Sequence, residues 1–309
     1  MEIEQELAKV APQRETLLAI GVFDGVHAGH RYLLGKLQRQ AAERDLLSGV
    51  VTFNPHPQSV LHAQNQLLWL GDVEDRVKAL QALGIELVAL LTFTPKLAQL
   101  GARDFMSLVK KHLRMRSIMV GPDFALGRSR EGNIGLLRTL GREMNFDVEV
   151  IAPYTINGEV VSSTLIRQAL AHGDMEKVRK LMGRYFELKG RVITSDKRGR
   201  VLGFPTANLD VKPQQALPAN GIYATFTHTD GKQFLSATNV GIRPTFGGGD
   251  TRVETHLLNY EGDLHGKQIR IEFVQKLRDE QRFSSSEELK AQIAKDVREV
   301  EAILAEDSK

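Results

Sequence analysis

Residues 20–30 read IGVFDGVHAGH, and this stretch decides the fold of the first half of the chain. The apolar residues 17–22 predict a short strand, and the glycines at 25 and 29 bound a tight loop. From residue 30 to residue 45 the apolar positions have the spacing of an amphipathic helix. The start of such a helix attracts anions through its unpaired N–H groups and its dipole. The stretch therefore predicts a phosphate site, in which His27 and His30 donate hydrogen bonds to phosphate oxygens.

Two other interpretations of His27 and His30 are a metal-binding pair and two ordinary surface histidines. A metal site would require a third protein ligand. The spacing of the sequence indicates no acidic residue or histidine for that role. Phosphate chemistry is the interpretation that we favour.

Strands and helices alternate through the first half of the chain. We expect further strands at residues 49–53, 87–93, 117–120 and 148–151, separated by helices at 75–83, 104–113 and 132–145. This alternation is typical of an α/β fold with a doubly wound parallel sheet. Ligands of such sheets bind beyond the carboxyl ends of the strands, where the histidine loop also lies.

The pattern changes near residue 183, after an expected joining helix at 172–186. Short strands are then expected at residues 190–194, 222–227, 234–240, 252–258 and 268–274. The pair Asp230-Gly231 is a strong hairpin signal. This half predicts a small antiparallel barrel or sandwich that ends in an amphipathic helix at 284–305, with Ser285 and Glu288 as a capping box. We therefore expect two domains, 1–182 and 183–309, which suits a chain of 309 residues.

Composition excludes several classes of protein. The absence of cysteine excludes disulfides, thiolate nucleophiles and cysteine-based metal sites. The 41 basic and 38 acidic residues give a net charge of +3 without a long basic stripe, which disfavours nucleic acid as the ligand. The N-terminus lacks an apolar signal region, and no apolar run is long enough to span a bilayer. We expect a soluble, cytoplasmic protein with small-molecule substrates, as a monomer or weak homo-oligomer.

A second phosphate motif follows at residues 162–167, which read SSTLIR. Hydroxyl groups and an arginine at the start of a helix suit phosphate oxygens, although this pattern alone is often only a helix cap. Together with His-x-Gly-His it resembles the nucleotidylyltransferase superfamily. The lysine-rich loop of the related class I aminoacyl-tRNA synthetases is missing.

The order of motifs along the whole chain is more specific. The strings GVFDGVHAGH, TFNPHP, VGPDFALG and SSTLIRQAL are followed by RGRVLGFPTAN, GIY, NVGIRPTF, VETH and LRDEQRF. This order resembles the bacterial bifunctional riboflavin kinase/FMN adenylyltransferases, the prokaryotic FAD synthetases, over roughly residues 15–300. The resemblance implies an N-terminal domain that adenylylates FMN and a C-terminal domain that phosphorylates riboflavin, both with ATP and Mg²⁺.

The resemblance also implies roles for residues of the N-terminal domain. His27 and His30 would act on the phosphates as catalytic residues. The expected binding residues of this domain are Gly21, Phe23, Asp24 and Gly25 around the adenine nucleotide, Ser163, Thr164 and Arg167 at the triphosphate, and Asn54 and Asp123 facing the flavin or a metal ion.

In the C-terminal domain the resemblance implies that Glu254 is the catalytic base. The expected binding residues are Gly199, Arg200 and Gly203 in a flap over ATP, Pro205, Thr206 and Asn208 at the Mg²⁺-linked motif, and Arg278, Glu280 and Phe283 on the flavin side. The metal ligands among them would be Thr206 and Asn208.

Elementary chemistry agrees with these kinase roles. A threonine hydroxyl and an asparagine carbonyl are hard oxygen ligands that suit Mg²⁺. A glutamate held on one face of a strand can accept the proton of an attacking primary alcohol. The alternatives are an ordinary turn at residues 205–208 and a solvated strand residue at Glu254.

Several positions depart from the family pattern. These are Asn54, Leu126, Ser195, Lys197 and His265, and they bear on substrate affinity more than on reaction type. Two further interpretations stay open at this point. The chain could have one competent module, a kinase with a weakened adenylyltransferase, or it could be a flavin- or nucleotide-binding regulator without turnover.

Overall fold

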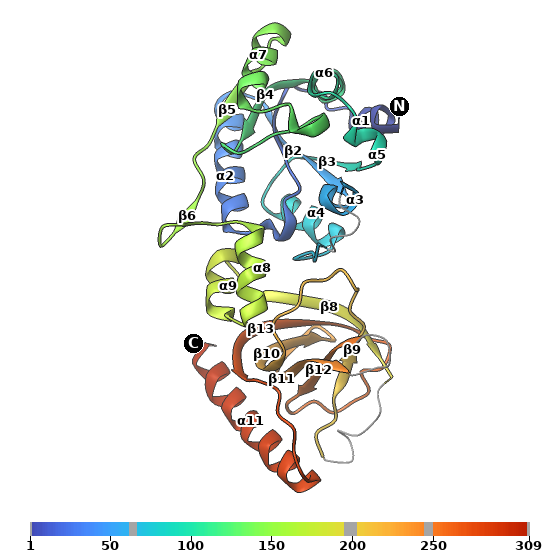
Figure 1. Ribbon diagram of the computed structural model, residues 1–309, viewed down its shortest axis with the longest axis vertical. Helices are drawn as coiled ribbons and strands as arrows, with labels where there is room; N and C mark the ends of the chain where they lie inside the picture. Colours follow the sequence, from blue (N-terminus) through green and yellow to red (C-terminus); the bar gives the residue numbers. More distant parts are fainter. Residues whose placement is uncertain (1, 62–66, 195–202, 244–249, 308–309) are drawn as a thin grey trace. The chain divides into compact units, whose positions relative to one another are not determined.

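The computed structural model describes residues 2–61, 67–194, 203–243 and 250–307. The chain divides into two compact units, Met1–Ser163 and Thr164–Lys309 (Figure 1). The change from α/β to β structure is therefore confirmed. The boundary lies ahead of the two helices that precede the barrel strands, whereas the sequence analysis expected it at 182/183.

The first unit is built on a five-stranded parallel sheet with the order β3-β2-β1-β4-β5. Its strands are β1 (Thr16–Ile20), β2 (Leu47–Asn54), β3 (Leu87–Thr92), β4 (Met115–Val120) and β5 (Asp147–Val150). The expected doubly wound parallel sheet is confirmed. β1 lies at the centre, so the histidine loop leaves the middle of the sheet at its carboxyl end.

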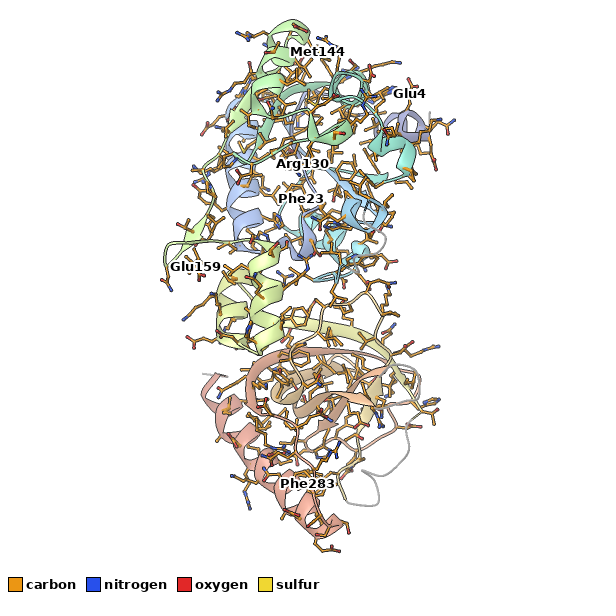
Figure 2. The ribbon with its side chains drawn as sticks, in the orientation of Figure 1. Glu4, Phe23, Arg130, Met144, Glu159 and Phe283 are labelled. Carbon is orange, nitrogen blue, oxygen red and sulfur yellow. The ribbon has the colours of Figure 1, made fainter. Side chains whose placement is uncertain are left out.

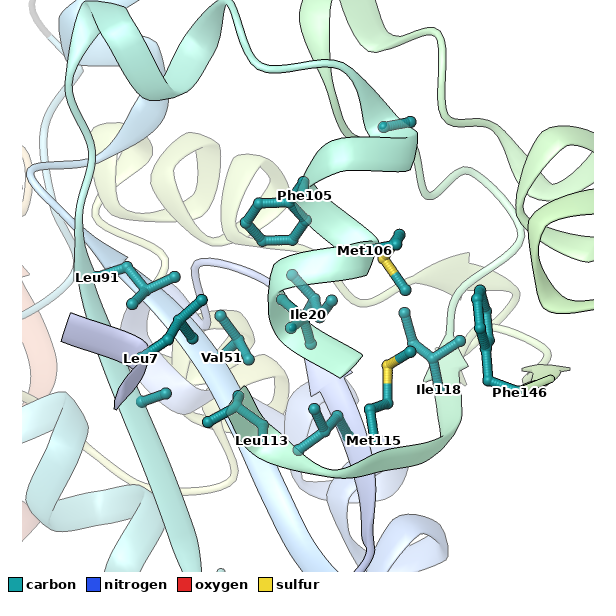
Figure 3. Packing of buried hydrophobic residues seen from close by; sticks show 14 of the residues in the cluster. Leu7, Ile20, Val51, Leu91, Phe105, Met106, Leu113, Met115, Ile118 and Phe146 are labelled. Carbon is teal, nitrogen blue, oxygen red and sulfur yellow. The ribbon is translucent and has the colours of Figure 1, made fainter. Parts of the chain in front are cut away.

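Helices cover both faces of this sheet. They are α1 (Glu2–Val10), α2 (Ala28–Glu43), α3 (Pro57–Leu61), α4 (Val73–Ala82), α5 (Pro95–Ala98), α6 (Ala102–Leu113) and α7 (Ile134–Met144). One core contains Leu7 of α1 and Phe105 of α6 against Ile20 of β1 (Figure 3). The other contains Leu34 of α2 and Leu80 of α4. Because successive strand residues face opposite sides, β1 contributes to both cores.

Besides the short helices α3 and α5, two elements of this unit were not expected. The first is α1, whose Glu6 carboxylate accepts hydrogen bonds from the backbone N–H and the hydroxyl of Thr92. The second is the hairpin of β6 (Thr155–Ile156) and β7 (Glu159–Val160), which turns at Asn157-Gly158 with positive φ at both residues. Both elements are short, and apolar periodicity is weak over a few residues.

The second unit contains a closed barrel with the strand order β10-β11-β12-β9-β8-β13. Its strands are β8 (Phe186–Ile193), β9 (Ala207–Leu209), β10 (Gly221–Thr229), β11 (Lys232–Arg243), β12 (Asp250–Leu257) and β13 (Gln268–Arg278). The expected antiparallel barrel is confirmed. The hairpin at Asp230-Gly231 is confirmed too, with φ of 51° and 72°.

Strand β9 was not expected as a strand. It has three residues, which is too short for an alternating pattern to show in sequence. It pairs with β12 on one side and with β8 on the other, so it closes the barrel. The ordinary turn considered for residues 205–208 is therefore wrong for Asn208, whose backbone is part of the sheet.

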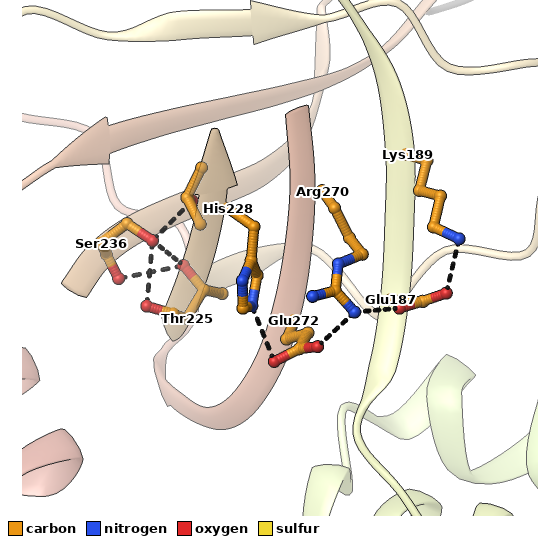
Figure 4. Close-up of polar contacts among 8 residues, drawn as sticks. Glu187, Lys189, Thr225, His228, Ser236, Arg270 and Glu272 are labelled. Carbon is orange, nitrogen blue, oxygen red and sulfur yellow. Dashed lines mark hydrogen bonds and ion pairs between the residues drawn. The ribbon is translucent and has the colours of Figure 1, made fainter. Parts of the chain in front are cut away.

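Hydroxyl groups fill part of the barrel interior. Thr225, Ser236 and Thr238 are fully buried, and the Thr225 hydroxyl lies 2.8 Å from the Ser236 hydroxyl and 2.7 Å from that of Thr238. Outside the barrel, a charged row runs across neighbouring strands through His228, Glu272, Arg270, Glu187 and Lys189 (Figure 4). The buried hydroxyls satisfy one another, so this core is polar without leaving these groups unpaired.

Three helices complete the second unit: α8 (Ser163–His172), α9 (Met175–Met182) and α11 (Ser286–Asp307). The apolar side of α11 buries Val300 and Leu304 against the barrel. Its cap is confirmed in part. The Glu288 backbone N–H donates to the Ser285 hydroxyl, but the Glu288 carboxylate accepts from Ser284 rather than from Ser285.

Candidate functional site

The two histidines of the first unit meet at the start of α2. His27 caps the helix, and its Nδ1 accepts a hydrogen bond of 3.3 Å from the backbone N–H of His30. The imidazole rings stack with centroids 3.6 Å apart. Because an accepting Nδ1 carries no proton, the neutral His27 ring has its N–H at Nε2, where it can donate to a ligand.

The glycines of this loop permit a close fit of the backbone. Gly25 has φ of +73°, and a Cβ there would lie 2.9 Å from the Cβ of Leu70. A Cβ at Gly29 would lie 3.1 Å from the carbonyl oxygen of Val161. Phe23, labelled in Figure 2, lies beside the histidines, with its ring centroid 5.1 Å from that of His30. A side chain at Gly25 would be strained and would collide with Leu70, and one at Gly29 would crowd the Val161 carbonyl.

Two charged side chains, the buried Asp24 and the half-buried Arg76, support the loop. Asp24 is buried, and its carboxylate accepts the backbone N–H of Leu70 at 3.1 Å. Arg76 of α4 donates to the carbonyl oxygens of Val22 at 2.7 Å and Phe53 at 2.9 Å, the ends of two neighbouring strands. This geometry makes Asp24 and Arg76 positioning residues of the loop. The sequence analysis missed Arg76, because nothing local marks an arginine in a helix as part of a distant site.

The electrostatics of the loop keep His30 uncharged. Burial, followed by the nearby His27 and Arg76, lowers the pKa of His30 well below its usual value. Its Nδ1 is buried and has no hydrogen-bond partner. A neutral imidazole can still donate one hydrogen bond to a phosphate oxygen. An unpartnered buried nitrogen marks the place as one where a ligand would supply the missing contact.

A cavity of about 750 Å³ opens beside this loop. Its walls include Gly21, Phe53, Asp123, Leu126 and Arg130. Arg130 also donates to the backbone carbonyl of Asp123 at 3.2 Å. The cavity is large enough for a flavin or a nucleotide, since ligand pockets range from about 300 to 1,000 Å³. Gly21 and Asp123 line the same cavity, although we expected them at different ligands, and Leu126 faces the same space.

The remaining expected residues of the first unit divide between two places. Asn54, at the end of β2, lines a small neighbouring cavity with Asp24 and Arg76. Ser163 lies at the start of α8, and its hydroxyl donates to the backbone carbonyl of Asp24 at 3.2 Å. Thr164 and Arg167 are in the first turns of α8, which belong to the second compact unit.

The second unit brings Asn208 and Glu254 together. Asn208 on β9 and Glu254 on β12 are direct partners in the sheet register. Arg252, two residues before Glu254 on the same face, joins them. Its Nε donates to Asn208 Oδ1 at 2.5 Å, and its terminal nitrogen forms an ion pair with Glu254. The Glu254 side chain is half-buried, at 20% exposure, and paired with Arg252, which argues against a merely solvated strand residue.

The segment before β9 holds the other expected nucleotide residues. The Pro205 carbonyl accepts a hydrogen bond of 2.8 Å from His256 Nδ1, and Thr206 follows half-buried. Gly203 has φ of 89°, a conformation that favours glycine. Gly199 and Arg200, like Ser195 and Lys197, lie outside the described residues.

The three expected flavin-side residues gather at the end of β13. The Arg278 guanidinium lies over the ring of Phe283, 5.9 Å from its centroid. The same guanidinium forms two hydrogen bonds, of 2.9 and 2.7 Å, with the buried Asp296 of α11. Glu280 packs against Gly241 of β11, where a Cβ would collide with its carboxylate. Asp296 was missed by the sequence analysis, since it looked like one more polar residue of an amphipathic helix.

Two general findings concern the described parts of the chain. In them, no group of three or more His, Asp or Glu side chains is arranged to hold a metal ion. Of the helices described, none is long and apolar enough to cross a membrane.

These sites define a class of protein. A loop for phosphates at the carboxyl end of a parallel sheet is typical of nucleotidylyl transfer. A carboxylate beside oxygen ligands on a small barrel suits transfer of a phosphoryl group to an alcohol. The chain is a two-unit transferase of this kind.

Comparisons with known proteins extend this conclusion to a family. The family model of FAD synthetase matches residues 9–165, and that of riboflavin kinase matches residues 182–304. The bifunctional riboflavin kinase/FMN adenylyltransferase of Escherichia coli (strain K12) is 39% identical over 93% of this chain and 92% of its own length. That of Pseudomonas fluorescens is 35% identical over 99% and 98%.

A solved structure shares the fold. The structure titled macrolide-efflux protein from Streptococcus pneumoniae matches with a TM-score of 0.88 and 26% identity, over 96% of each chain. The two family models and the relatives that match nearly end to end are decisive. The chain belongs to the family of bifunctional riboflavin kinase/FMN adenylyltransferases.

Proposed function

We propose that the second unit phosphorylates riboflavin and that the first unit adenylylates the resulting FMN, with the residues identified above. The observation that carries the kinase assignment is the register of β9 and β12, which sets Asn208 directly opposite Glu254. Phosphoryl transfer requires a base for the alcohol close to the group that holds the nucleotide phosphates. The pairing provides both within one rung of the sheet.

In the kinase step, Glu254 accepts the proton of the riboflavin 5′-hydroxyl as that oxygen attacks the γ-phosphorus of ATP. The new O–P bond forms while the bond between the γ-phosphorus and the bridging oxygen breaks. ADP leaves with the electron pair. Arg252 lies between Asn208 and Glu254 and supplies positive charge next to the transferred group. Charge stabilisation and positioning account for most of the catalysis in such reactions.

The donor set on β9 and the segment before it fits Mg²⁺. The Thr206 hydroxyl and Asn208 Oδ1 are hard oxygens of the kind that Mg²⁺ takes together with substrate phosphates and water. Asn208 Oδ1 already accepts one hydrogen bond from Arg252, and a carbonyl oxygen has two lone pairs. Bound Mg²⁺ would neutralise charge that develops on the β- and γ-phosphates.

In the adenylylation step, the nucleophile is the phosphate of FMN. Its second pKa is near 6, so it is ionised at pH 7 and requires no general base. It attacks the α-phosphorus of ATP, and pyrophosphate leaves. The His27 Nε2–H can donate to these oxygens. The work of this site is positioning and electrostatic stabilisation.

Product analysis tests the proposal directly. The purified chain is incubated with riboflavin, ATP and Mg²⁺, and riboflavin, FMN and FAD are separated over time. We expect FMN to rise first and FAD to follow, and removal of Mg²⁺ with a chelator to stop both steps. FMN without FAD would indicate a chain with one competent module. Binding of flavin without either product would indicate a regulator.

The domain limits 1–182 and 183–309, the cytoplasmic location and the oligomeric state stay predictions. The riboflavin kinase model begins at residue 182, which supports the expected functional boundary. The helices α8 and α9 nevertheless belong to the second compact unit.

A further inference from the structure

Three residues paired side by side across β9, β12 and β11, called the rung below, extend the candidate kinase site. Glu254 on β12 pairs with Asn208 of β9 on one side and with Asn239 of β11 on the other. Residues opposite one another in adjacent strands point to the same face of a sheet. Asn239 therefore stands beside Glu254, on the side away from Asn208.

The two asparagines that flank Glu254 each have a buried polar atom with no hydrogen-bond partner. For Asn208 this atom is the donor Nδ2, and for Asn239 it is the acceptor Oδ1. A buried polar group without a partner costs roughly 1–3 kcal/mol, and few are found in native proteins. Two such atoms on either side of a carboxylate indicate a place where a ligand supplies the missing partners.

The two sides of the rung offer different hydrogen-bonding groups. On the β9 side it presents an unpartnered donor and the Arg252 guanidinium, which suit the acceptor oxygens of a phosphate. On the β11 side it presents an unpartnered acceptor, which requires an O–H or N–H donor from the ligand. Phosphate oxygens that are ionised cannot donate, whereas an alcohol can. The nucleotide is thus favoured on the β9 side and the alcohol on the β11 side.

Glu280 supports this direction independently. It packs against Gly241, which lies two residues after Asn239 on β11 and on the same face. Glu280 is one of the residues expected on the flavin side. The flavin-side segment and Asn239 thus adjoin the same strand.

We propose that Asn239 is a substrate-binding residue of the kinase site, whose Oδ1 accepts a hydrogen bond from the 4′-hydroxyl of the ribityl chain. This inference rests on the proposed function of the second unit. The 4′-hydroxyl is one carbon from the 5′-hydroxyl that Glu254 activates. Cβ atoms of paired residues lie about 4.5–5.5 Å apart, so side chains on adjacent strands can reach neighbouring hydroxyls. Asn239 would thereby select a polyol chain and orient its terminal oxygen.

The proposal is tested by a double-perturbation cycle, in which the side chain of Asn239 and the 4′-hydroxyl of the substrate are removed separately and together. Asn239→Ala is compared with the unchanged protein on riboflavin, 4′-deoxyriboflavin and 2′-deoxyriboflavin, with kcat/KM for the flavin measured at saturating ATP. We expect a loss of roughly tenfold on riboflavin and on 2′-deoxyriboflavin, the effect of one hydrogen bond. On 4′-deoxyriboflavin the two proteins should agree within about twofold, because the partner hydroxyl is already missing.

Two further variants complete the design. Gln233→Ala, an exposed position on the same strand, is the matched control and should resemble the unchanged protein on all three flavins. Asn239→Ser keeps a polar side chain and should show the same pattern with a smaller loss of kcat/KM. It replaces Asn239→Ala in the test if the alanine variant does not fold. FAD formation from supplied FMN should be unchanged in each variant, because that reaction takes place in the other unit.

The outcomes separate this inference from the proposed function. An equal loss on riboflavin and 4′-deoxyriboflavin would overturn the role of Asn239 and leave the kinase assignment intact. The role of Asn239 would also be overturned if Asn239→Ala had the same kcat/KM for riboflavin as the unchanged protein. An unchanged protein that forms no FMN from riboflavin would overturn the kinase assignment itself, and the inference with it.

Discussion

At the scale of single residues, the two candidate sites differ because their nucleophiles carry different charges. The kinase must ionise an alcohol, and it holds a carboxylate, Glu254, within reach of a guanidinium and two amides. The adenylyltransferase receives a nucleophile that is already ionised, and its loop presents the uncharged imidazole of His30 beside the ring of His27. The side chains present in each site thus follow from the charge of the nucleophile that it has to activate.

Glu254→Gln should reduce FMN formation by at least about a hundredfold, the lower range of general-base contributions. Glutamine keeps the shape of the side chain but cannot take the proton of the 5′-hydroxyl. The measurement is the rate of FMN formation from riboflavin at saturating ATP. Glu187→Gln, in the charged row outside the barrel, is the matched control. A rate of Glu254→Gln within a few-fold of the unchanged protein would place the base elsewhere.

His30 should make the stability of the first unit depend on pH. Burial, with His27 and Arg76 nearby, lowers its pKa well below the usual value, whereas in the unfolded chain the imidazole titrates near 6.5. Below about pH 6.5 the unfolded chain therefore binds more protons than the folded one, and stability falls as the pH drops. Thermal unfolding from pH 8 to pH 5 should show a steeper loss for the unchanged protein than for His30→Gln. Parallel curves would contradict a neutral His30 with a lowered pKa.

At the scale of elements, short segments position the catalytic groups. The three residues of β9 place Asn208 opposite Glu254, and α11 holds the end of β13 through the ion pair of Asp296 with Arg278. Breaking a buried ion pair by removing one partner typically costs about 3–5 kcal/mol. Arg278 therefore acts first as a support for the segment that carries Glu280 and Phe283.

The helix α9 has a similar supporting role. It packs on β8 and β13 and buries Val178 and Leu181. We expect a fragment of residues 183–309 to fold and to phosphorylate riboflavin, because the barrel and α11 are complete without α9. A fragment of residues 164–309 should unfold at a higher denaturant concentration, since burying one such side chain contributes about 1.5–3 kcal/mol. If only the longer fragment is soluble and active, the functional domain includes α8 and α9.

At the scale of the whole molecule, the two activities should be separable by substitution. His27→Ala and His30→Ala should abolish FAD formation from FMN and leave FMN formation from riboflavin near that of the unchanged protein. The reason is that His27 and His30 lie in the first compact unit, whereas Asn208 and Glu254 lie in the second. Both rates are measured on the same preparation, so that a folded kinase unit serves as the internal control. Equal loss of both products in a folded variant would show that the two sites are not independent.

Contiguous sequence patterns were enough to predict the class of each unit and to propose many residues of its candidate site. The histidine loop, the SSTLIR segment and the alternation of strands and helices are contiguous patterns. A strand, a glycine turn and a helix start are specified by neighbouring residues, so their chemistry can be read without the fold. His27, His30 and Gly25 belong to this group.

The contacts between residues of distant segments depend on the folding of each unit and could not be predicted from the sequence. Arg76 reaches the ends of β1 and β2, Asp296 pairs with Arg278, and Asn239 stands beside Glu254. Strand register and helix packing bring these groups together, and a shift of one residue in register would turn Asn239 to the opposite face. Long-range pairing of this kind depends on the packing of the whole unit. No local pattern around these three residues could have indicated their partners.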